Sequence, residues 1–294
     1  MPGISTICFA ASYTVALLLE LARLRLSGRA LRWLAMGFVG VGLIAQTLFL
    51  GHRAAVAPTA PLSSAYDWYL VAAWLLAAVD LYLTAFHPQV PHGIFVLPLV
   101  LALIGAAQLA DHKPFPRSPA AQVWGSIHGT FWLLGAVAVM VGFVAGLMYL
   151  VQAYRLKQKL PAGSGLRLPS LEWLQRVNGR AIVVSVLMTG IGILSGLVLN
   201  LVNHHRDQQD ELPWSDPVVW RSGGMFAWLL AAALFGAVYK PARLGRKVAY
   251  LTVASFVFLV IFLAVQLLDT GEHGSKGRGE QGAAKPQATR EAEQ

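Results

Sequence analysis

The chain has 294 residues, of which 56% are hydrophobic and only 13% are charged, and its mean hydropathy is +0.57. Soluble domains carry roughly 25% charged residues, so this composition excludes an ordinary soluble fold. Intrinsic disorder, a disulfide scaffold and a repeat array are also excluded, because the chain is apolar, has a single cysteine and shows no fixed period of similar segments. The sequence therefore predicts an all-α, polytopic membrane protein.

Eight apolar stretches approach the length needed to cross a bilayer, which is about 20 mostly apolar residues in a helix. The predicted spans are Ile4–Ala22, Ala30–Leu50, Tyr66–Phe86, Gly93–Ala110, His128–Val151, Ala181–Val202, Met225–Tyr239 and Val248–Leu268. They predict one transmembrane bundle within residues 1–270. Residues 271–294 contain almost no large apolar side chain, which predicts a disordered polar tail.

The basic residues, which give the chain its net charge of +9, fall mainly in alternate loops. Three of these loops hold the four basic residues from Arg23 to Arg32, the six from Arg155 to Arg180 and the four from Lys240 to Lys247. The loops between them hold Arg53, Lys113, Arg117, Arg206 and Arg221. Because Lys and Arg accumulate on the cytoplasmic side, this pattern predicts an inner-membrane protein with both termini outside. It also favours the lipid bilayer, and not nucleic acid, as the partner of the basic residues.

Six histidines fall at the predicted outer face: His52, His112, His128, His204, His205 and His273. The other two, His87 and His92, fall on the inner side. A single interfacial histidine is most simply a solvated side chain. Imidazole is also a good axial ligand of haem iron, and several histidines on one face can build such a site. The sequence alone does not show which of the six converge.

The loop between the sixth and seventh predicted spans carries two tryptophans, Trp214 and Trp220, around a Ser-Asp-Pro motif. One interpretation makes the indoles interfacial anchors. Asp216 would then be the N-cap of a helix that has Pro217 at its first position. The other interpretation makes the indoles an aromatic platform for a flat, hydrophobic macrocycle, with flanking histidines as ligands.

Two acidic residues fall inside predicted spans, where a charge is costly. Asp80 is either a functional group or a structural hydrogen-bonding group. Glu20 lies near the inner end of its span, so we expect it either to snorkel to the interface or to pair with Arg23. Two pairs of glycines four residues apart, Gly142–Gly146 and Gly192–Gly196, are expected to let helices pack closely within the bundle.

Four segments, in chain order, carry a resemblance to one family. They are residues 51–53 (GHR) followed by 61–68 (PLSSAYDW), the span expected to open at His128 together with residues 169–174 (PSLEWL), residues 214–220 (WSDPVVW), and the last span leading to His273. These segments resemble the cytochrome c assembly membrane proteins, which include CcsA of the System II pathway and its HemX-like and YpjD-like relatives. The resemblance covers most of the chain.

The resemblance implies an inner-membrane protein that handles haem in c-type cytochrome biogenesis. In CcsA-type members, a tryptophan-rich WWD loop flanked by two external histidines holds haem for attachment to apocytochrome c. By resemblance, the ligands of the haem iron are His128 and His273, and Asp67 matches an acidic residue that follows a further histidine. The cofactor-binding residues implied in this way are His128, His273, His52, Trp214, Asp216 and Trp220.

Two departures from the family pattern indicate an accessory role. A polar run, Arg206–Leu212, replaces the Gly- and Trp-rich first half of the WWD motif, and Ala233–Tyr239 contains no histidine where synthetases carry one. They favour a haem-binding or accessory protein over an enzyme, so we expect no catalytic residue. Haem is the expected cofactor, and a cytochrome c assembly protein is the expected partner.

Two other functions are compatible with the sequence. The first is a HemX-like regulatory or scaffold protein of tetrapyrrole metabolism that binds no haem and contacts its partner through the basic loop Arg155–Arg180. The second is a transporter or channel, which is disfavoured because the spans lack a set of polar residues lining a path.

Overall fold

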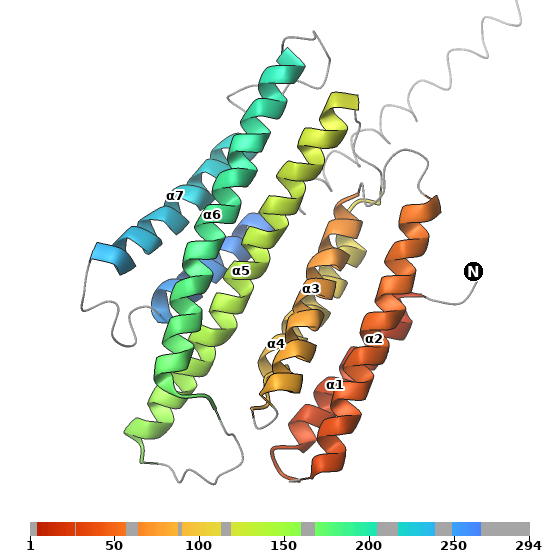
Figure 1. Cartoon of the computed structure of the whole chain (residues 1–294), viewed down its shortest axis with the longest axis vertical. Coiled ribbons are helices and arrows are strands. Elements are labelled where there is room, and N and C mark those ends of the chain that lie inside the picture. Colours follow the sequence, from red (N-terminus) through yellow and green to blue (C-terminus); the bar gives the residue numbers. More distant parts are fainter. Residues whose placement is uncertain are drawn as a thin grey trace, which may run out of the picture.

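The computed structural model describes residues 5–26, 28–56, 64–87, 90–112, 119–159, 168–204, 217–238 and 249–265. In this part of the chain there are eight helices and no strand, which confirms the predicted all-α class (Figure 1). The labelled helices are α1 (Thr6–Ala22), α2 (Arg29–Val56), α3 (Ala65–Phe86), α4 (Gly93–Leu109), α5 (Pro119–Lys157), α6 (Leu171–His204) and α7 (Pro217–Val238). The eighth, Ala249–Val265, is called the last helix below.

Each helix corresponds to one predicted span, but their lengths differ. Five helices, α2, α3, α5, α6 and α7, are long and apolar enough to cross a membrane. The other three helices, α1, α4 and the last helix, are shorter. Both α1 and α4 have 17 residues. A helix of this length is at the lower limit for the hydrocarbon core.

The two central helices begin earlier than the hydropathy of the sequence predicted. The helix α5 has 39 residues and begins at Pro119, so the expectation that His128 opens it was wrong. The helix α6 has 34 residues and begins at Leu171, where the Ser170 hydroxyl accepts a hydrogen bond from the Trp173 backbone N–H. Their first turns are mixed in polarity, and hydropathy registers only the apolar stretch that follows.

The helices form two halves, α1–α4 and α5–α7 with the last helix. The helices α5 and α6 pack along most of their length, and the halves meet where α3 and α4 face α5 (Figure 1). The expected glycine packing is confirmed. A Cβ at Gly142 would lie 3.1 Å from the Ala181 Cβ, and a Cβ at Gly146 would lie 2.6 Å from the Thr252 hydroxyl oxygen.

The last helix runs antiparallel to α5. Its first residue, Ala249, has its carbonyl oxygen 3.2 Å from a Cβ built at Gly146 of α5. Near its other end, the Phe262 ring stacks on Trp132 of α5, with 5.1 Å between ring centroids. The last helix therefore ends on the same face and near the same level of α5 as His128, which lies one turn before Trp132.

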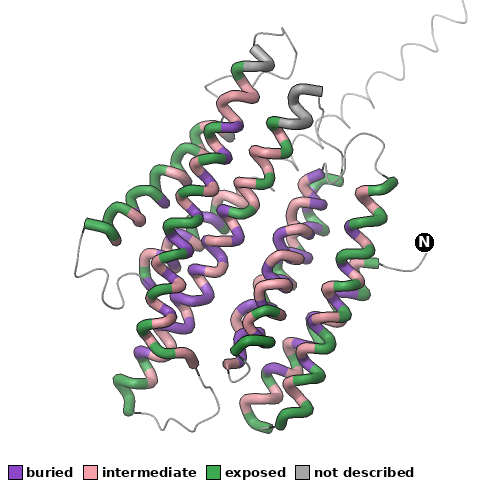
Figure 2. The backbone as a smooth tube through the Cα atoms, viewed as in Figure 1, coloured by how far each residue is buried: buried purple, intermediate pink, exposed green. Residues whose placement is uncertain are grey.

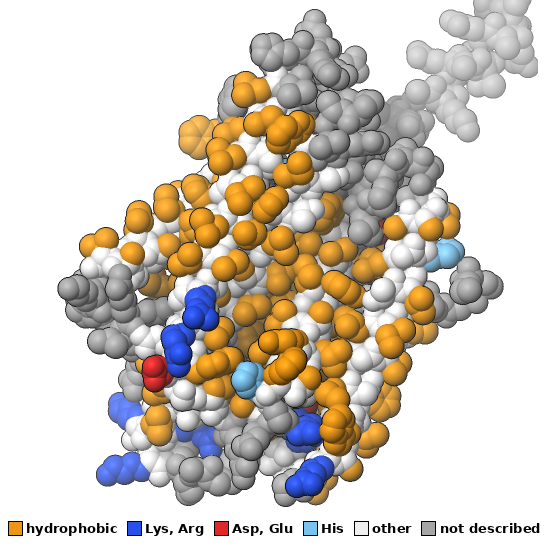
Figure 3. Space-filling model, in the orientation of Figure 1, with side chains coloured by type: hydrophobic (Ala, Val, Ile, Leu, Met, Phe, Trp, Pro, Cys, Tyr) orange, Lys and Arg blue, Asp and Glu red, His pale blue; other side chains and the backbone are white. Residues whose placement is uncertain are grey.

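Many outward faces of the helices are apolar, as Figures 2 and 3 show together. On α6, for example, Val183, Leu187 and Leu194 are exposed. Inside, the Tyr13 hydroxyl donates to the Gln46 side-chain oxygen at 2.7 Å, and the Gln46 amide donates to the Leu70 carbonyl at 2.9 Å. The buried side chains of Tyr13 and Gln46 thus link α1, α2 and α3 through hydrogen bonds while apolar side chains face outward, as expected of a protein surrounded by lipid.

Lysines and arginines gather at one end of the bundle (Figure 3). We call it the basic end. The described basic residues in and beside the α1–α2 and α5–α6 connections lie there: Arg23, Arg25, Arg29, Arg32, Arg155, Lys157 and Lys159. We call the other end of the bundle the opposite end. It is formed by the last turns of α2, α4 and α6 and the first turns of α3, α5 and α7. Among the described residues at that end, the basic side chains are Arg53 and Arg221.

Candidate functional site

The described residues include half of the predicted haem-site residues, and all of these lie toward the opposite end. His52 is exposed in the last turns of α2, His128 is half-buried in α5, and Trp220 is 73% exposed in the first turn of α7. They come from three different helices. Outside the described residues lie Trp214, Asp216 and His273.

His128 is held by α6. Its Nδ1 lies 2.7 Å from the Gly192 carbonyl oxygen, which can only accept, so Nδ1–H donates. The hydrogen bond fixes the tautomer that leaves the lone pair on Nε2, the nitrogen that can coordinate a metal. A histidine whose second ring nitrogen is held by a backbone carbonyl is the usual arrangement of a metal-ligating imidazole.

Two glycines of α6 make room for this contact. A Cβ at Gly196 would lie 2.8 Å from the His128 Nδ1, and a Cβ at Gly192 would lie 3.1 Å from the Trp132 Cδ1. Both distances are shorter than ordinary van der Waals contacts. The glycine pair that the sequence predicted as packing positions therefore also fixes the orientation of the His128 ring.

The first turn of α3 is fixed by Asp67. The Arg53 Nε of α2 lies 2.6 Å from the Asp67 Oδ1, and the Ser64 hydroxyl donates to the Asp67 Oδ2 at 2.8 Å. Ser64 and Asp67 also form a capping box. The Asp67 backbone N–H donates to the Ser64 hydroxyl oxygen, and the Ser64 backbone N–H donates to the Asp67 Oδ2. We call Arg53, Ser64 and Asp67 the α2–α3 clamp.

An aromatic stack extends the α2–α3 clamp to the residues that follow α4. The Arg53 guanidinium lies 4.8 Å from the centroid of the Tyr66 ring, and the His112 ring stacks on Tyr66 with centroids 4.3 Å apart. The Tyr66 backbone N–H donates to the Asp111 carbonyl at 3.3 Å. The first turn of α3 is therefore held both by α2 and by the residues that follow α4.

Trp68 connects this region to His128. It follows Asp67 directly, and its indole packs at the surface of α5, where a Cβ at Gly129 would lie 2.8 Å from the Trp68 Cζ2. Gly129 is the residue after His128. The two halves of the bundle therefore approach closely beside the predicted ligand.

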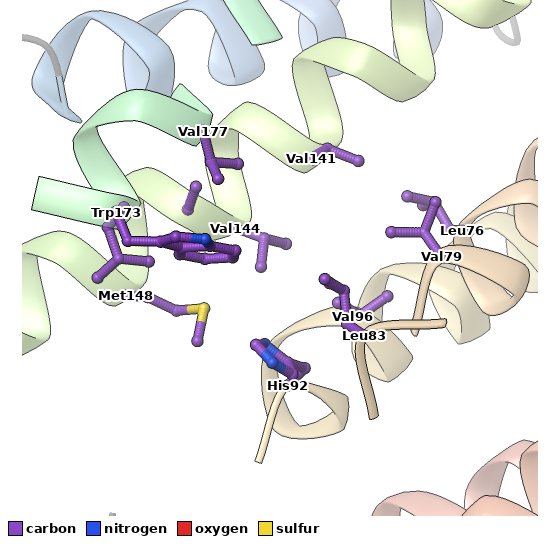
Figure 4. Close-up of a pocket in the computed structure, with 12 residues that line it drawn as sticks. Leu76, Val79, Leu83, His92, Val96, Val141, Val144, Met148, Trp173 and Val177 are labelled. Atoms are coloured by element: carbon purple, nitrogen blue, oxygen red, sulfur yellow. The ribbon is translucent and has the colours of Figure 1, made fainter. Parts of the chain in front are cut away.

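A small pocket lies between the two halves toward the basic end (Figure 4). It contains about 380 Å³ of space free of protein atoms, part of it open to the outside. Its walls are aliphatic except for His92, Met148 and Trp173. Burial, reinforced by the charges of His87 and Arg23, lowers the pKa of His92 to about 4, so its imidazole is neutral at pH 7.

Two buried acids, Glu20 and Asp80, lie close enough for their charges to interact, and Glu20 also contacts Gly93, the residue after His92. Glu20 pairs with Arg23, one of the two arrangements that the sequence predicted, and a Cβ at Gly93 would lie 2.9 Å from the Glu20 Cγ. Asp80 is buried in α3. Among the described residues, the Glu20 Oε2, the Asp80 Oδ1 and the His92 Nε2 have no hydrogen-bond partner. We call Glu20, Asp80 and His92 the buried polar cluster.

The sequence did not reveal the contacts that build the α2–α3 clamp and the buried polar cluster. Arg53 is visible in the sequence only as a loop charge and as part of a segment that resembles the family, and its partner Asp67 is indicated by the resemblance alone. The capping-box spacing of Ser64 and Asp67 was the available signal. Nothing in the sequence predicts the roles of Gly129 and His92, because these roles depend on contacts with other helices.

Comparisons with known proteins identify the family of this chain. The family model described as Cytochrome C assembly protein matches residues 62–273. The chain is 23% identical over 297 aligned positions to "Cytochrome c biogenesis protein CcsA" of Gloeobacter violaceus, covering 82% of this chain and 85% of that protein. No solved structure matches the chain. The family model covers well over half of this chain, from α3 to the last helix. This chain therefore belongs to the cytochrome c assembly protein family.

Proposed function

We propose that this protein binds haem at the opposite end of the bundle during assembly of c-type cytochromes, with His128 as one ligand of the iron. Membership of the cytochrome c assembly family and the similarity to a cytochrome c biogenesis protein support this role. The observation that carries the proposal is the His128 side chain. Its Nδ1–H is engaged by the Gly192 carbonyl, so Nε2 is the nitrogen that can donate a lone pair.

His273 is the proposed second ligand. The last helix ends at Val265, close to where Phe262 stacks on Trp132, and Trp132 is one turn from His128. His273 follows Val265 by 8 positions in the sequence. A segment of this length spans at most about 27 Å, so the chain can reach from the last helix to His128.

The remaining predicted residues would pack around the cofactor. The exposed indole of Trp220 offers an apolar face at the opposite end, and Trp214 and Asp216 would complete the WWD-like loop before α7. His52, exposed on α2, is a candidate for a further contact. Haem would supply an iron centre, and His128 and His273 would hold it.

We also propose that the basic end faces the cytoplasm. The described basic residues of the α1–α2 and α5–α6 connections lie there, and the positive-inside rule then places His128 and both termini at the outer face of the inner membrane. In this orientation the site faces the compartment in which an apocytochrome partner would be met. The departures in the WWD motif favour an accessory haem-binding role over the attachment reaction itself.

The test is haem content. Protein purified in detergent from haem-replete cells is assayed by absorbance and pyridine haemochrome, beside His128→Ala and His273→Ala variants. We expect a Soret band in the native protein and about tenfold lower haem retention in each variant. His87→Ala is the matched control, because His87 is an exposed histidine at the basic end.

Two outcomes would contradict the proposal in different ways. Unchanged haem content in a monodisperse His128→Ala protein would contradict the ligand assignment. A folded native protein without haem would contradict haem binding itself, and it would favour the regulatory or scaffold role in tetrapyrrole metabolism.

A further inference from the structure

The opposite end contains a continuous series of contacts that leads from α2 to His128. It begins with the Arg53–Asp67 ion pair, passes to Trp68 in the first turn of α3, and reaches α5 at Gly129. His128 comes next and is held on its other side by Gly192 of α6. Four helices are thus connected around one imidazole.

The α2–α3 clamp has the properties of a rigid element. The Asp67 side chain is 6% exposed and that of Arg53 is 33% exposed. Each Asp67 oxygen has its own partner, Arg53 on Oδ1 and the Ser64 hydroxyl on Oδ2. The Asp67 carboxylate is buried, so losing the partly exposed Arg53 would leave its charge uncompensated, and this cost favours the paired arrangement.

The contact at Gly129 transmits this constraint between the halves. The Trp68 indole fits at Gly129 because a glycine leaves space where any other residue would carry a Cβ 2.8 Å from the Cζ2 atom. A large ring at a close contact has little freedom to move, so a shift of the first turn of α3 must displace the indole or α5. The backbone that would be displaced carries His128.

We propose that Arg53, Asp67 and Trp68 are positioning residues, which fix the α5 backbone so that the His128 Nε2 faces the opposite end in one orientation. The proposal rests on the proposed function, since it concerns the residue that would bind iron. Its mechanical part, the coupling of the α2–α3 clamp to α5, does not require haem.

The mechanical part is tested first, on the protein without added haem. In a Cys8→Ser background, spin labels are placed on two exposed positions, Ala55→Cys of α2 and Thr130→Cys of α5. Pulsed electron–electron double resonance then measures the distance distribution between them. We expect one narrow distribution, which Arg53→Gln broadens or shifts and Arg53→Lys, which keeps the cation, largely restores.

Two variants separate this effect from general destabilisation. Arg176→Gln breaks the exposed Glu172–Arg176 pair, whose side chains are 83% and 61% exposed, and it should leave the distribution unchanged. Ser64→Ala removes the capping box and keeps the Arg53–Asp67 pair. An effect of Ser64→Ala that Arg53→Gln does not share would overturn the role of the ion pair.

The second test uses the haem-loaded protein. Arg53→Gln is expected to weaken haem retention, but by less than the about tenfold loss expected of His128→Ala, because Arg53 acts on the ligand only through Asp67, Trp68 and α5. It should also shift the reduction potential and broaden the low-spin electron paramagnetic resonance signals, which a merely less stable protein would not do. Arg53→Lys should restore the potential.

The outcomes distinguish the two proposals. If the native protein binds no haem but Arg53→Gln broadens the distance distribution, the proposed function fails and the coupling stands. If Arg53→Gln and Arg176→Gln give the same distances, potential and haem retention as the native protein, the positioning role is overturned.

Discussion

The two ends of the bundle differ in whether their buried polar groups have hydrogen-bond partners. At the opposite end, both oxygens of Asp67 have partners and the Nδ1 of His128 is held by a carbonyl. In the buried polar cluster near the basic end, the Asp80 Oδ1 and the His92 Nε2 have no hydrogen-bond partner among the described residues. Paired groups order a site, whereas unpaired ones cost free energy. The predicted ligand therefore lies in the better-ordered of the two polar regions.

The largest expected effect is the loss of the ion pair at the opposite end. Arg53→Ala leaves the buried Asp67 carboxylate uncompensated, so we expect the free energy of unfolding to fall by about 3 kcal/mol. Arg176→Ala, which breaks an exposed pair, should change it by less than about 1 kcal/mol. Denaturant titration in detergent measures both variants. Equal effects would show that the α2–α3 clamp is no stronger than a surface pair.

The stability contributed by His92 at the basic end is expected to depend on pH. The pKa of His92 is lowered to about 4, mainly by burial, so the unfolded chain binds a proton more readily than the folded one. The contribution of neutral His92 is complete above the ordinary histidine pKa of about 6.5 and is lost as the pH falls toward 4. We expect this loss to approach about 3 kcal/mol. His92→Phe should flatten this part of the stability curve; an unaltered curve would show that another group causes the dependence.

The contact between the halves gives a smaller effect. Gly129→Ala places a methyl group against the Trp68 ring, and we expect a loss of about 2 kcal/mol. Gly125→Ala is the matched control one turn earlier in α5, because its Cβ would lie 3.9 Å from the Leu199 Cδ2, an ordinary contact. Thermal unfolding of the two variants should differ by several degrees. Identical midpoints would mean that the indole can move aside freely.

The smallest predicted effect has the opposite sign. Asp80→Leu replaces a buried carboxyl that has an unpartnered oxygen with an apolar side chain of similar size. We expect the free energy of unfolding to rise by about 1 kcal/mol, because the cost of the unpaired group disappears. Denaturant titration is again the measurement. Destabilisation would indicate that Asp80 has a partner that stabilises it.

Much of the fold followed from hydropathy and charge, and the site followed only in part. Apolar stretches located all eight helices, since each helix that faces lipid must be apolar over most of its length. The early starts of α5 and α6 were missed because their first turns mix polar and apolar residues. His128 was identified by resemblance, but its partner Gly192 is 64 positions away and only the packing of α5 on α6 brings them together.

The direction of the last helix has a practical consequence for handling the protein. Because that helix ends near the level of Trp132, its last residue, Val265, lies at the same end of the bundle as His128. A polyhistidine affinity tag at the C-terminus would bring a row of extra imidazoles within reach of any iron bound there, and it could imitate or replace a natural ligand. A histidine-free tag avoids this competition, and haem spectra from the two tagged forms should agree only if His128 and its natural partner already fill the coordination sphere.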